Sequence, residues 1–191
     1  GMQFTDTTAL VGNDLSTFPS FPAEIRAPAG TLPGVSGFQI HFSDEDIKTP
    51  GDEPNVLVVM NPAALRVNLS DLPEGGVIIA NRDTFTENNL DKAGYKEDPL
   101  TDGSLSKYRV ISLPISTLNA EAVKDIPELT RAQADRCKNF LALGIMFWLY
   151  DRPLDYNLQW IREKFSKMPS VAQANEKALK GGYTFAIATE Q

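Results

Sequence analysis

Hydrophobic and polar positions along the chain follow two periods, and they predict strands alternating with helices. Continuous runs of branched apolar residues at 55–60 and 77–81 are typical of strands buried on both faces of a parallel sheet. Helical patterns follow these runs at 61–69 and 84–94, and a third strand candidate lies at 108–114. The order predicts a β-α-β-α-β arrangement, which in one sheet implies parallel strands and right-handed crossovers.

Local signals mark where several of these elements begin and end. Asn61 before Pro62 is typical of a helix N-cap followed by a proline at the first helical position. Gly94 is expected just past the end of the second helix. The sequence from Thr130 to Gln133 forms a capping box, which predicts the start of a long helical region.

The C-terminal third is predicted to be helical, in segments of about 130–151, 155–168 and 169–181. Gly181-Gly182 is interpreted as the end of the last helix, because adjacent glycines favour termination. The residues that follow are expected to add an edge strand or a docked tail. The whole pattern predicts an α/β protein of three layers, α/β/α, with a mostly parallel central sheet and a helical C-terminal third.

The N-terminal part is densest in proline and glycine, which interrupt regular secondary structure, in the segment 21–42, FPAEIRAPAGTLPGVSGFQIHF. Its last six residues alternate apolar and polar positions, which predicts a half-buried strand. The residues 3–14 resemble the end of a helix closed by Gly12-Asn13, and the acidic segment 43–54 is predicted to be a surface loop. Gly1 is interpreted as a tag remnant.

Composition restricts the partners and the chemistry. The 191 residues suit one domain over 1–191, and the net charge of -7 argues against nucleic acid or an anionic membrane as partner. The longest apolar run, 140–150, is shorter than the roughly 20 residues of a membrane span. One cysteine and one histidine cannot supply a zinc site or an iron–sulfur cluster, and the single cysteine fits a reducing cytoplasm.

Two groups of residues are candidates for a site. In the first, Glu24 and Arg26 share a face of an extended segment, and Gly30 and Gly34 shape the loop beside them. A rigid loop can orient a guanidinium for a carboxylate or phosphate. The simpler interpretation is an exposed ion pair beside an irregular loop, since the glycines do not form a nucleotide-binding motif.

In the second group, Asn61 and Asn81 follow buried parallel strands, and Arg82 is adjacent to Asn81. Ligands of open α/β sheets bind outside the carboxyl ends of the strands, near helix N-termini whose N–H groups suit anions. The alternative for Asn61 is an ordinary N-cap. From the residues alone, the sequence indicates a sheet edge that suits an anion and no visible catalytic machinery.

Several segments together resemble one family, the gamma domain of 2-oxoacid:acceptor oxidoreductases, which are the pyruvate or 2-oxoglutarate:ferredoxin enzymes. The resemblance rests on the segment 21–42, MNPAAL, GGVIIAN, and CKNFLALG, which contains Asn139, with the later Lys-Phe, Asn175 and Gly181. It covers most of residues 13–183 and is closest to the form fused at the N-terminus of the alpha subunit. In that form a strand and a glycine-rich turn precede the first helix. This chain starts at or just after that point, which suggests a truncated chain or an unusual gene arrangement.

The resemblance implies a multi-subunit enzyme that decarboxylates a 2-oxoacid on thiamine diphosphate, forms an acyl-CoA and passes electrons to ferredoxin. Thiamine diphosphate, magnesium and iron–sulfur clusters are then expected in the alpha and beta partners, so this chain alone would bind none of them and be inactive alone. The domain would contribute to the packing of the subunits. Whether it binds CoA, and whether it forms homo-oligomers, stays open. Under this reading the eight candidate residues face CoA, an anion or a subunit.

The alternatives are a free-standing α/β ligand-binding or regulatory module without turnover, and a purely structural docking domain. Fusion or genomic adjacency to thiamine-binding partners would distinguish the enzyme domain from both. Sequence leaves open which 2-oxoacid the complete enzyme uses.

Overall fold

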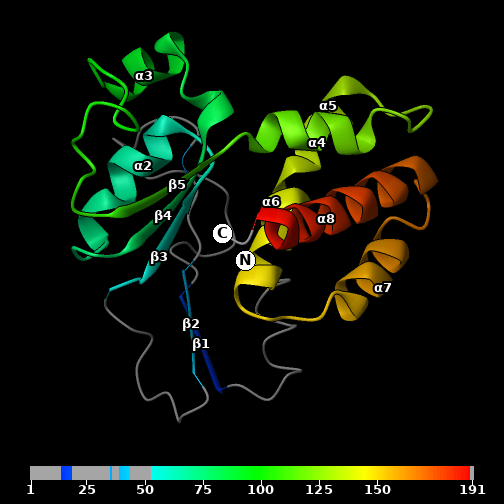
Figure 1. Ribbon diagram of the computed structural model, residues 1–191. Helices are drawn as coiled ribbons and strands as arrows, with labels where there is room; N and C mark the ends of the chain where they lie inside the picture. Colours follow the sequence, from blue (N-terminus) through cyan, green and yellow to red (C-terminus); the bar gives the residue numbers. More distant parts are fainter. Residues whose placement is uncertain (1–13, 19–34, 36–38, 44–52, 190–191) are drawn as a thin grey trace. The chain divides into compact units, whose positions relative to one another are not determined.

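The computed structural model describes residues 14–18, 35, 39–43 and 53–189 (Figure 1). These residues belong to two compact units, one ending at Pro114 and the other beginning at Ile115, and each unit is described by itself. The interpretations of residues 3–13 and of most of the segment 43–54 lie outside the described residues. The single domain over 1–191 stays a prediction.

The first unit contains a two-stranded antiparallel ladder. Strand β1 (Asp14–Phe18) pairs with β2 (Gln39–Ser43), with Asp14 opposite Ser43 and Phe18 opposite Gln39. The strand predicted from the alternation at the end of the 21–42 segment is therefore confirmed as β2. Strand β1 was not predicted, because DLSTF offers neither an apolar run nor a clear alternation.

The same unit contains a parallel sheet with the order β3-β4-β5, as the sequence pattern predicted. Its strands are β3 (Val56–Val59), β4 (Val77–Asn81) and β5 (Arg109–Leu113). Val59 lies opposite Ala80, and Asn81 lies opposite Leu113, so the carboxyl ends of the three strands are in register. This register places the residues that follow β3 and β4 at one edge of the sheet.

Helices and short 3-10 turns connect these strands. They are α2 (Pro62–Asn68), η1 (Leu69–Asp71), η2 (Arg82–Thr84) and α3 (Glu87–Ala93). Gly94 ends α3 in the left-handed conformation, at φ 80°, as its position predicted. Side chains from β3, β4, α2 and the connecting segments form one buried cluster: Val59, Leu65, Leu72, Ile78, Ala80, Phe85 and Leu105.

The second unit is helical. It contains α4 (Ile115–Val123), α5 (Arg131–Arg136), α6 (Lys138–Leu149), α7 (Asp155–Lys164) and α8 (Pro169–Thr189). The capping box at Thr130 is present and begins α5. The helix predicted over 130–151 is in fact two helices separated at Cys137, and α4 was not predicted. The α/β class with a parallel sheet and a helical C-terminal third is confirmed.

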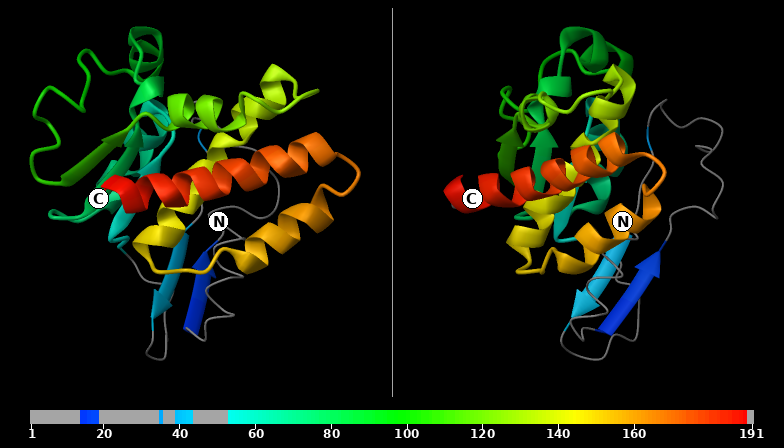
Figure 2. Two further views of the ribbon diagram at one scale, coloured as in Figure 1. Left: turned by 45° about the vertical axis from the view of Figure 1, so that its right-hand side comes forward. Right: turned by 90° about the vertical axis from the view of Figure 1, so that its right-hand side faces the viewer.

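The predicted end of the last helix at Gly181-Gly182 is wrong, and so is the strand or tail expected beyond it, because α8 continues to Thr189. The two glycines lie within the helix where α8 crosses α6 (Figure 2). A Cβ on Gly182 would lie 2.0 Å from the Leu141 carbonyl oxygen, and one on Gly144 would lie 2.0 Å from the Leu179 carbonyl oxygen. Gly144 and Gly182 are therefore required by helix packing, since they allow the backbones of α6 and α8 to touch.

Among the described residues, no helix is long and apolar enough to cross a lipid bilayer. The apolar run 140–150 instead forms most of α6, and its side chains at Leu141, Ile145 and Phe147 are buried within the protein.

Candidate functional site

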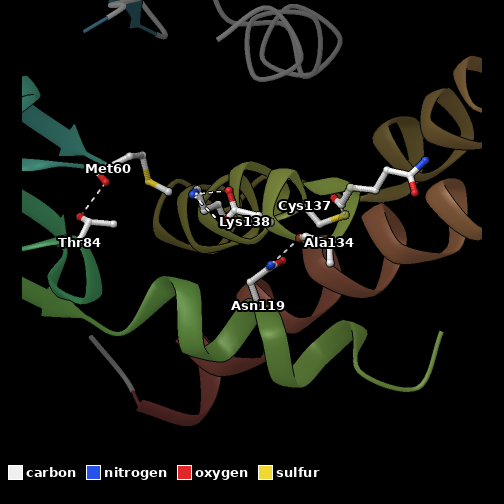
Figure 3. Close-up of polar contacts among 8 residues, drawn as sticks. Met60, Thr84, Asn119, Ala134, Cys137 and Lys138 are labelled. Atoms are coloured by element: carbon white, nitrogen blue, oxygen red, sulfur yellow. Dashed lines mark hydrogen bonds and ion pairs between the residues drawn. The ribbon is translucent and has the colours of Figure 1, made fainter. Parts of the chain in front are cut away.

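The sheet edge predicted to carry a site is formed by the residues that end β3 and β4. Thr84 connects the two strand ends, because its Oγ1 lies 2.9 Å from the Met60 carbonyl oxygen and 2.8 Å from that of Asn81 (Figure 3). A hydroxyl has one hydrogen to donate, so the two carbonyls share it. Asn89 Nδ2 in turn donates to the Thr84 carbonyl oxygen at 2.9 Å. Thr84 was not a sequence candidate, since nothing in RDTFT distinguishes it.

Asn61 occupies the N-cap position of α2, as predicted. Its Oδ1 accepts a hydrogen bond from the Ala64 N–H at 2.8 Å, and its carbonyl oxygen accepts one from the Leu65 N–H at 3.3 Å. Pro62 has no N–H. This absence suits the first helical position, where a backbone N–H has no partner within the helix. The structural role of Asn61 is accordingly clear.

Asn81 and Arg82 are adjacent but have different surroundings. Asn81 ends β4 and is fully buried, so its amide belongs to the interior of the sheet edge. Arg82 begins η2 and is exposed. Of the candidate residues at this edge, Arg82 is the one that presents a positive charge to solvent, where it can meet an anion.

A second arginine lies at the opposite end of α2 and is already engaged. Arg66 Nη1 donates to the Gly94 carbonyl oxygen at 2.9 Å, and the guanidinium lies 5.2 Å from the centre of the Tyr95 ring. Burial raises the pKa of Tyr95, and the nearby Arg66 charge partly opposes that rise. This contact joins α2 to the C-terminal end of α3, so Arg66 has a structural role distinct from that of Arg82.

In the helical unit, Asn139 is exposed in the first turn of α6. Its neighbour Lys138 forms an ion pair with Asp135, with the Nζ 2.8 Å from Oδ2 (Figure 3). Cys137 is buried, and its Sγ lies 3.3 Å from the Gln133 carbonyl oxygen. Burial, with a smaller contribution from Asp135, raises the pKa of the Cys137 thiol to about 11, so this side chain is neutral at physiological pH.

The break between α5 and α6 has a specific cause in the buried amide of Asn119 from α4. Its Nδ2 donates to the Ala134 carbonyl oxygen at 2.8 Å, and that oxygen also accepts the Cys137 N–H at 3.1 Å (Figure 3). A side chain that inserts into the hydrogen-bond ladder of a helix produces a break or kink at that point. The sequence pattern offered no signal for this insertion, because Asn119 is distant in sequence from the helix that it interrupts.

Glu24, Arg26, Gly30 and Gly34 lie outside the described residues, so their roles stay predictions. The described part of the chain contains no group of three or more histidine, cysteine or acidic side chains that could hold a metal ion. Cys137, the only cysteine in the sequence, is a buried and protonated thiol. With one cysteine in the sequence, the chain cannot supply the roughly four cysteine ligands of an iron–sulfur cluster.

Comparison with known proteins agrees with the resemblance seen in the sequence. The family model described as pyruvate ferredoxin/flavodoxin oxidoreductase matches residues 1–185. The chain is 52% identical over 190 residues to the 2-oxoglutarate oxidoreductase subunit KorA of Mycobacterium tuberculosis, a match that covers 100% of this chain and 29% of the relative. The chain thus spans less than a third of the length of this relative.

Solved structures show the same fold. The gamma subunit of a keto/oxoacid ferredoxin oxidoreductase from Geobacter sulfurreducens matches with a TM-score of 0.62 and 18% identity, over 98% of this chain and 89% of that one. A 2-oxoglutarate:ferredoxin oxidoreductase from Magnetococcus marinus, solved with 2-oxoglutarate, coenzyme A and succinyl-CoA bound, matches with a TM-score of 0.66 and 23% identity, over 96% and 27% of the two chains.

Proposed function

Since this chain belongs to the pyruvate ferredoxin/flavodoxin oxidoreductase family, we propose that it is the gamma-type domain of a 2-oxoacid:acceptor oxidoreductase. The complete enzyme would convert a 2-oxoacid and CoA to an acyl-CoA and carbon dioxide, and would pass two electrons to a ferredoxin-type acceptor. The observation that carries the proposal is the 52% identity to a 2-oxoglutarate oxidoreductase subunit along the entire chain. That relative makes 2-oxoglutarate the first substrate to assay.

The chemistry of the described residues supports a division of labour between this domain and its partners. Thiamine diphosphate, magnesium and iron–sulfur clusters would be held by alpha-type and beta-type partners. This proposal is supported by the single cysteine, which cannot ligate a cluster, and by the resemblance for the other two groups. The domain itself would contribute subunit packing, as a segment of a longer chain or as a separate subunit, and self-association is a further proposal. A cytoplasmic location is proposed from the family and from the single cysteine.

CoA is the ligand that this domain itself would contact. Arg82 is the exposed cation at the carboxyl end of the sheet, where parallel α/β sheets bind ligands, and it would meet a phosphate of CoA. Asn61 and Asn81 would line the same edge, toward CoA, an anion or a subunit. Arg26 with Glu24, Gly30 and Gly34 would supply a second cation on a rigid loop, and Asn139 would face CoA or a subunit.

The experiment that tests the proposal compares the chain alone with the chain plus thiamine-binding partner subunits. Each sample receives 2-oxoglutarate or pyruvate together with CoA, thiamine diphosphate, magnesium and an artificial electron acceptor. We expect no turnover from the chain alone and CoA-dependent reduction of the acceptor in the reconstituted mixture. Steady turnover by the chain alone would contradict the division of labour. Failure of the chain to associate with any such partner would instead favour a free-standing module.

Calorimetric titration of CoA into the chain separates ligand binding from docking. Heat of binding that fits one site would support the proposed CoA contact. Its absence at millimolar CoA, in a chain that still joins its partners, would leave subunit packing as the function of this domain.

A further inference from the structure

Charge is distributed unevenly along the sequence. Residues 131–180 contain nine lysines and arginines against five acidic residues, a net charge of +4, whereas the rest of the chain has a net charge of -11. Asymmetry of this size within one chain indicates that the segment faces partners of a different charge from those met by the rest. Helices α5, α6 and α7 and the first half of α8 lie in this basic segment.

Three aromatic side chains of this segment contact one another near the surface. The Phe140 and Phe165 rings lie 6.5 Å apart at an interplanar angle of 78°, and the Trp160 and Phe165 rings lie 6.2 Å apart at 88°. All three residues are partly exposed, and Met168, whose N–H donates to the Phe165 carbonyl oxygen at 2.8 Å, is 46% exposed. We call Phe140, Trp160, Phe165 and Met168 the aromatic patch.

Two exposed lysines flank Phe165 in the sequence. In the described part of the chain, the basic residues Lys138 and Arg162 form ion pairs, whereas Lys164 and Lys167 form none. Arg162 is held by Glu176 of α8, with the Nη2 2.9 Å from Oε2, so its charge is already compensated. Lys164 and Lys167 thus present positive charge beside apolar surface, and no acidic side chain described in the structure pairs with them.

We propose that the aromatic patch, with Lys164 and Lys167 beside it, docks an acidic segment that carries an apolar side chain and belongs to a partner subunit. Aromatic residues and methionine are enriched in the buried centres of protein interfaces, and charged residues at the rim steer the partner and select it by its charge. An acidic partner would be repelled by most of this chain, because the remainder is strongly negative. The aromatic patch offers such a partner both attraction and apolar surface.

The test rests on the proposed function, because the probe is the thiamine-binding partner subunit complex used for reconstitution. Its affinity for the full chain is measured by biolayer interferometry at low and at physiological salt. The double variant Lys164→Glu/Lys167→Glu should bind about tenfold more weakly, chiefly through a slower association rate, and the loss should shrink as salt rises. Met168→Ala should bind about fivefold more weakly, because it removes the most exposed apolar side chain of the aromatic patch.

The matched control is Lys92→Glu/Lys96→Glu, which changes the net charge equally on exposed residues of the other unit. It should bind as the wild type does, and thermal unfolding should show all variants folded. If the two double variants weakened binding equally, the loss of affinity would follow from net charge alone, and the proposal would be overturned. Unchanged affinity in Lys164→Glu/Lys167→Glu or in Met168→Ala would also overturn it. Failure of the wild-type chain to bind the partner subunits would instead contradict the proposed function.

Discussion

Replacing Gly182 by alanine tests whether backbone contact between α6 and α8 maintains the helical unit. The added methyl carbon would lie 2.0 Å from the Leu141 carbonyl oxygen and 3.2 Å from the Ile145 nitrogen. Carbon and oxygen atoms that are not bonded do not approach closer than about 3 Å, and both obstacles are backbone atoms that cannot rotate away. The helices would have to separate, and they would loosen the burial of Leu141 and Leu179 along the crossing.

The expected cost follows from two opposing effects. Alanine favours a helix over glycine by about 1 kcal/mol, because it restricts the unfolded chain. Overpacking costs typically about 1–3 kcal/mol, and more when the backbone itself must move. Because the clash here is with a backbone carbonyl oxygen, and Gly144 makes a second close contact in the same crossing, we expect the overpacking cost to lie at or above the top of that range. The net loss is then about 2 kcal/mol or more. That loss is a large part of the roughly 5–15 kcal/mol that stabilises an ordinary domain.

Gly181→Ala is the matched control, because the same substitution is made one position earlier in the same helix. Its methyl carbon would lie 3.5 Å from the Ala122 Cβ, which is an ordinary contact. We therefore expect this variant to gain up to about 1 kcal/mol from helix propensity. Urea denaturation followed by circular dichroism gives the free energy of unfolding of both variants and the wild type. If Gly182→Ala were as stable as Gly181→Ala, the reasoning from the helix crossing would be refuted.

Three further predictions concern single side chains. Asn61→Ala should lower the free energy of unfolding by about 0.5–2 kcal/mol, because the Ala64 N–H loses its cap, whereas Asn88→Ala on the exposed face of α3 should change it little; urea denaturation of both variants decides this. The pKa of Cys137 is raised from 9.0 to about 11, so the folded protein keeps a proton that the unfolded chain releases. The free energy of unfolding should therefore fall as pH rises from 9 to 11. Cys137→Ala should show a smaller fall over this pH range, and urea denaturation of the variant and the wild type at several pH values measures the difference. Arg82→Ala should weaken CoA binding by about 1–3 kcal/mol in a calorimetric titration, and Lys92→Ala should leave it unchanged; equal affinities of the wild type and Arg82→Ala would remove this residue from the site.

The parts of the fold that were predicted are those fixed by local chemistry. Strands β3 and β4 are continuous apolar runs, Pro62 after Asn61 permits a helix only from that point, and Gly94 adopts a backbone conformation that other residues avoid. Helix α4 was missed because Ile115 and Thr117 favour strands and its polar positions follow no clear period. Local signals could not identify it, since its burial depends on helices that lie later in the chain.

The sheet edge that we propose as a site was predictable in position and not in detail. Parallel strands place Asn61 and Asn81 at one sheet edge, and this follows from strand order alone. The N-cap hydrogen bond of Asn61 is local and was predicted, whereas the burial of Asn81 and the role of Thr84 between the two strand ends depend on tertiary contacts. Gly182 shows the same limit, because a glycine that ends a helix and one that admits a neighbouring helix look alike in sequence.

The crossing of α6 and α8 also has a consequence for the order in which the protein is made. Gly144 and Gly182 are 38 residues apart, so α6 emerges from the ribosome before the helix that covers it does. During that interval the apolar side chains of FLALGIMFWL lack their main partner and are exposed to other nascent chains or to chaperones. A nascent or truncated chain that stops before α8 is complete should therefore aggregate, even though every residue of α6 is already present.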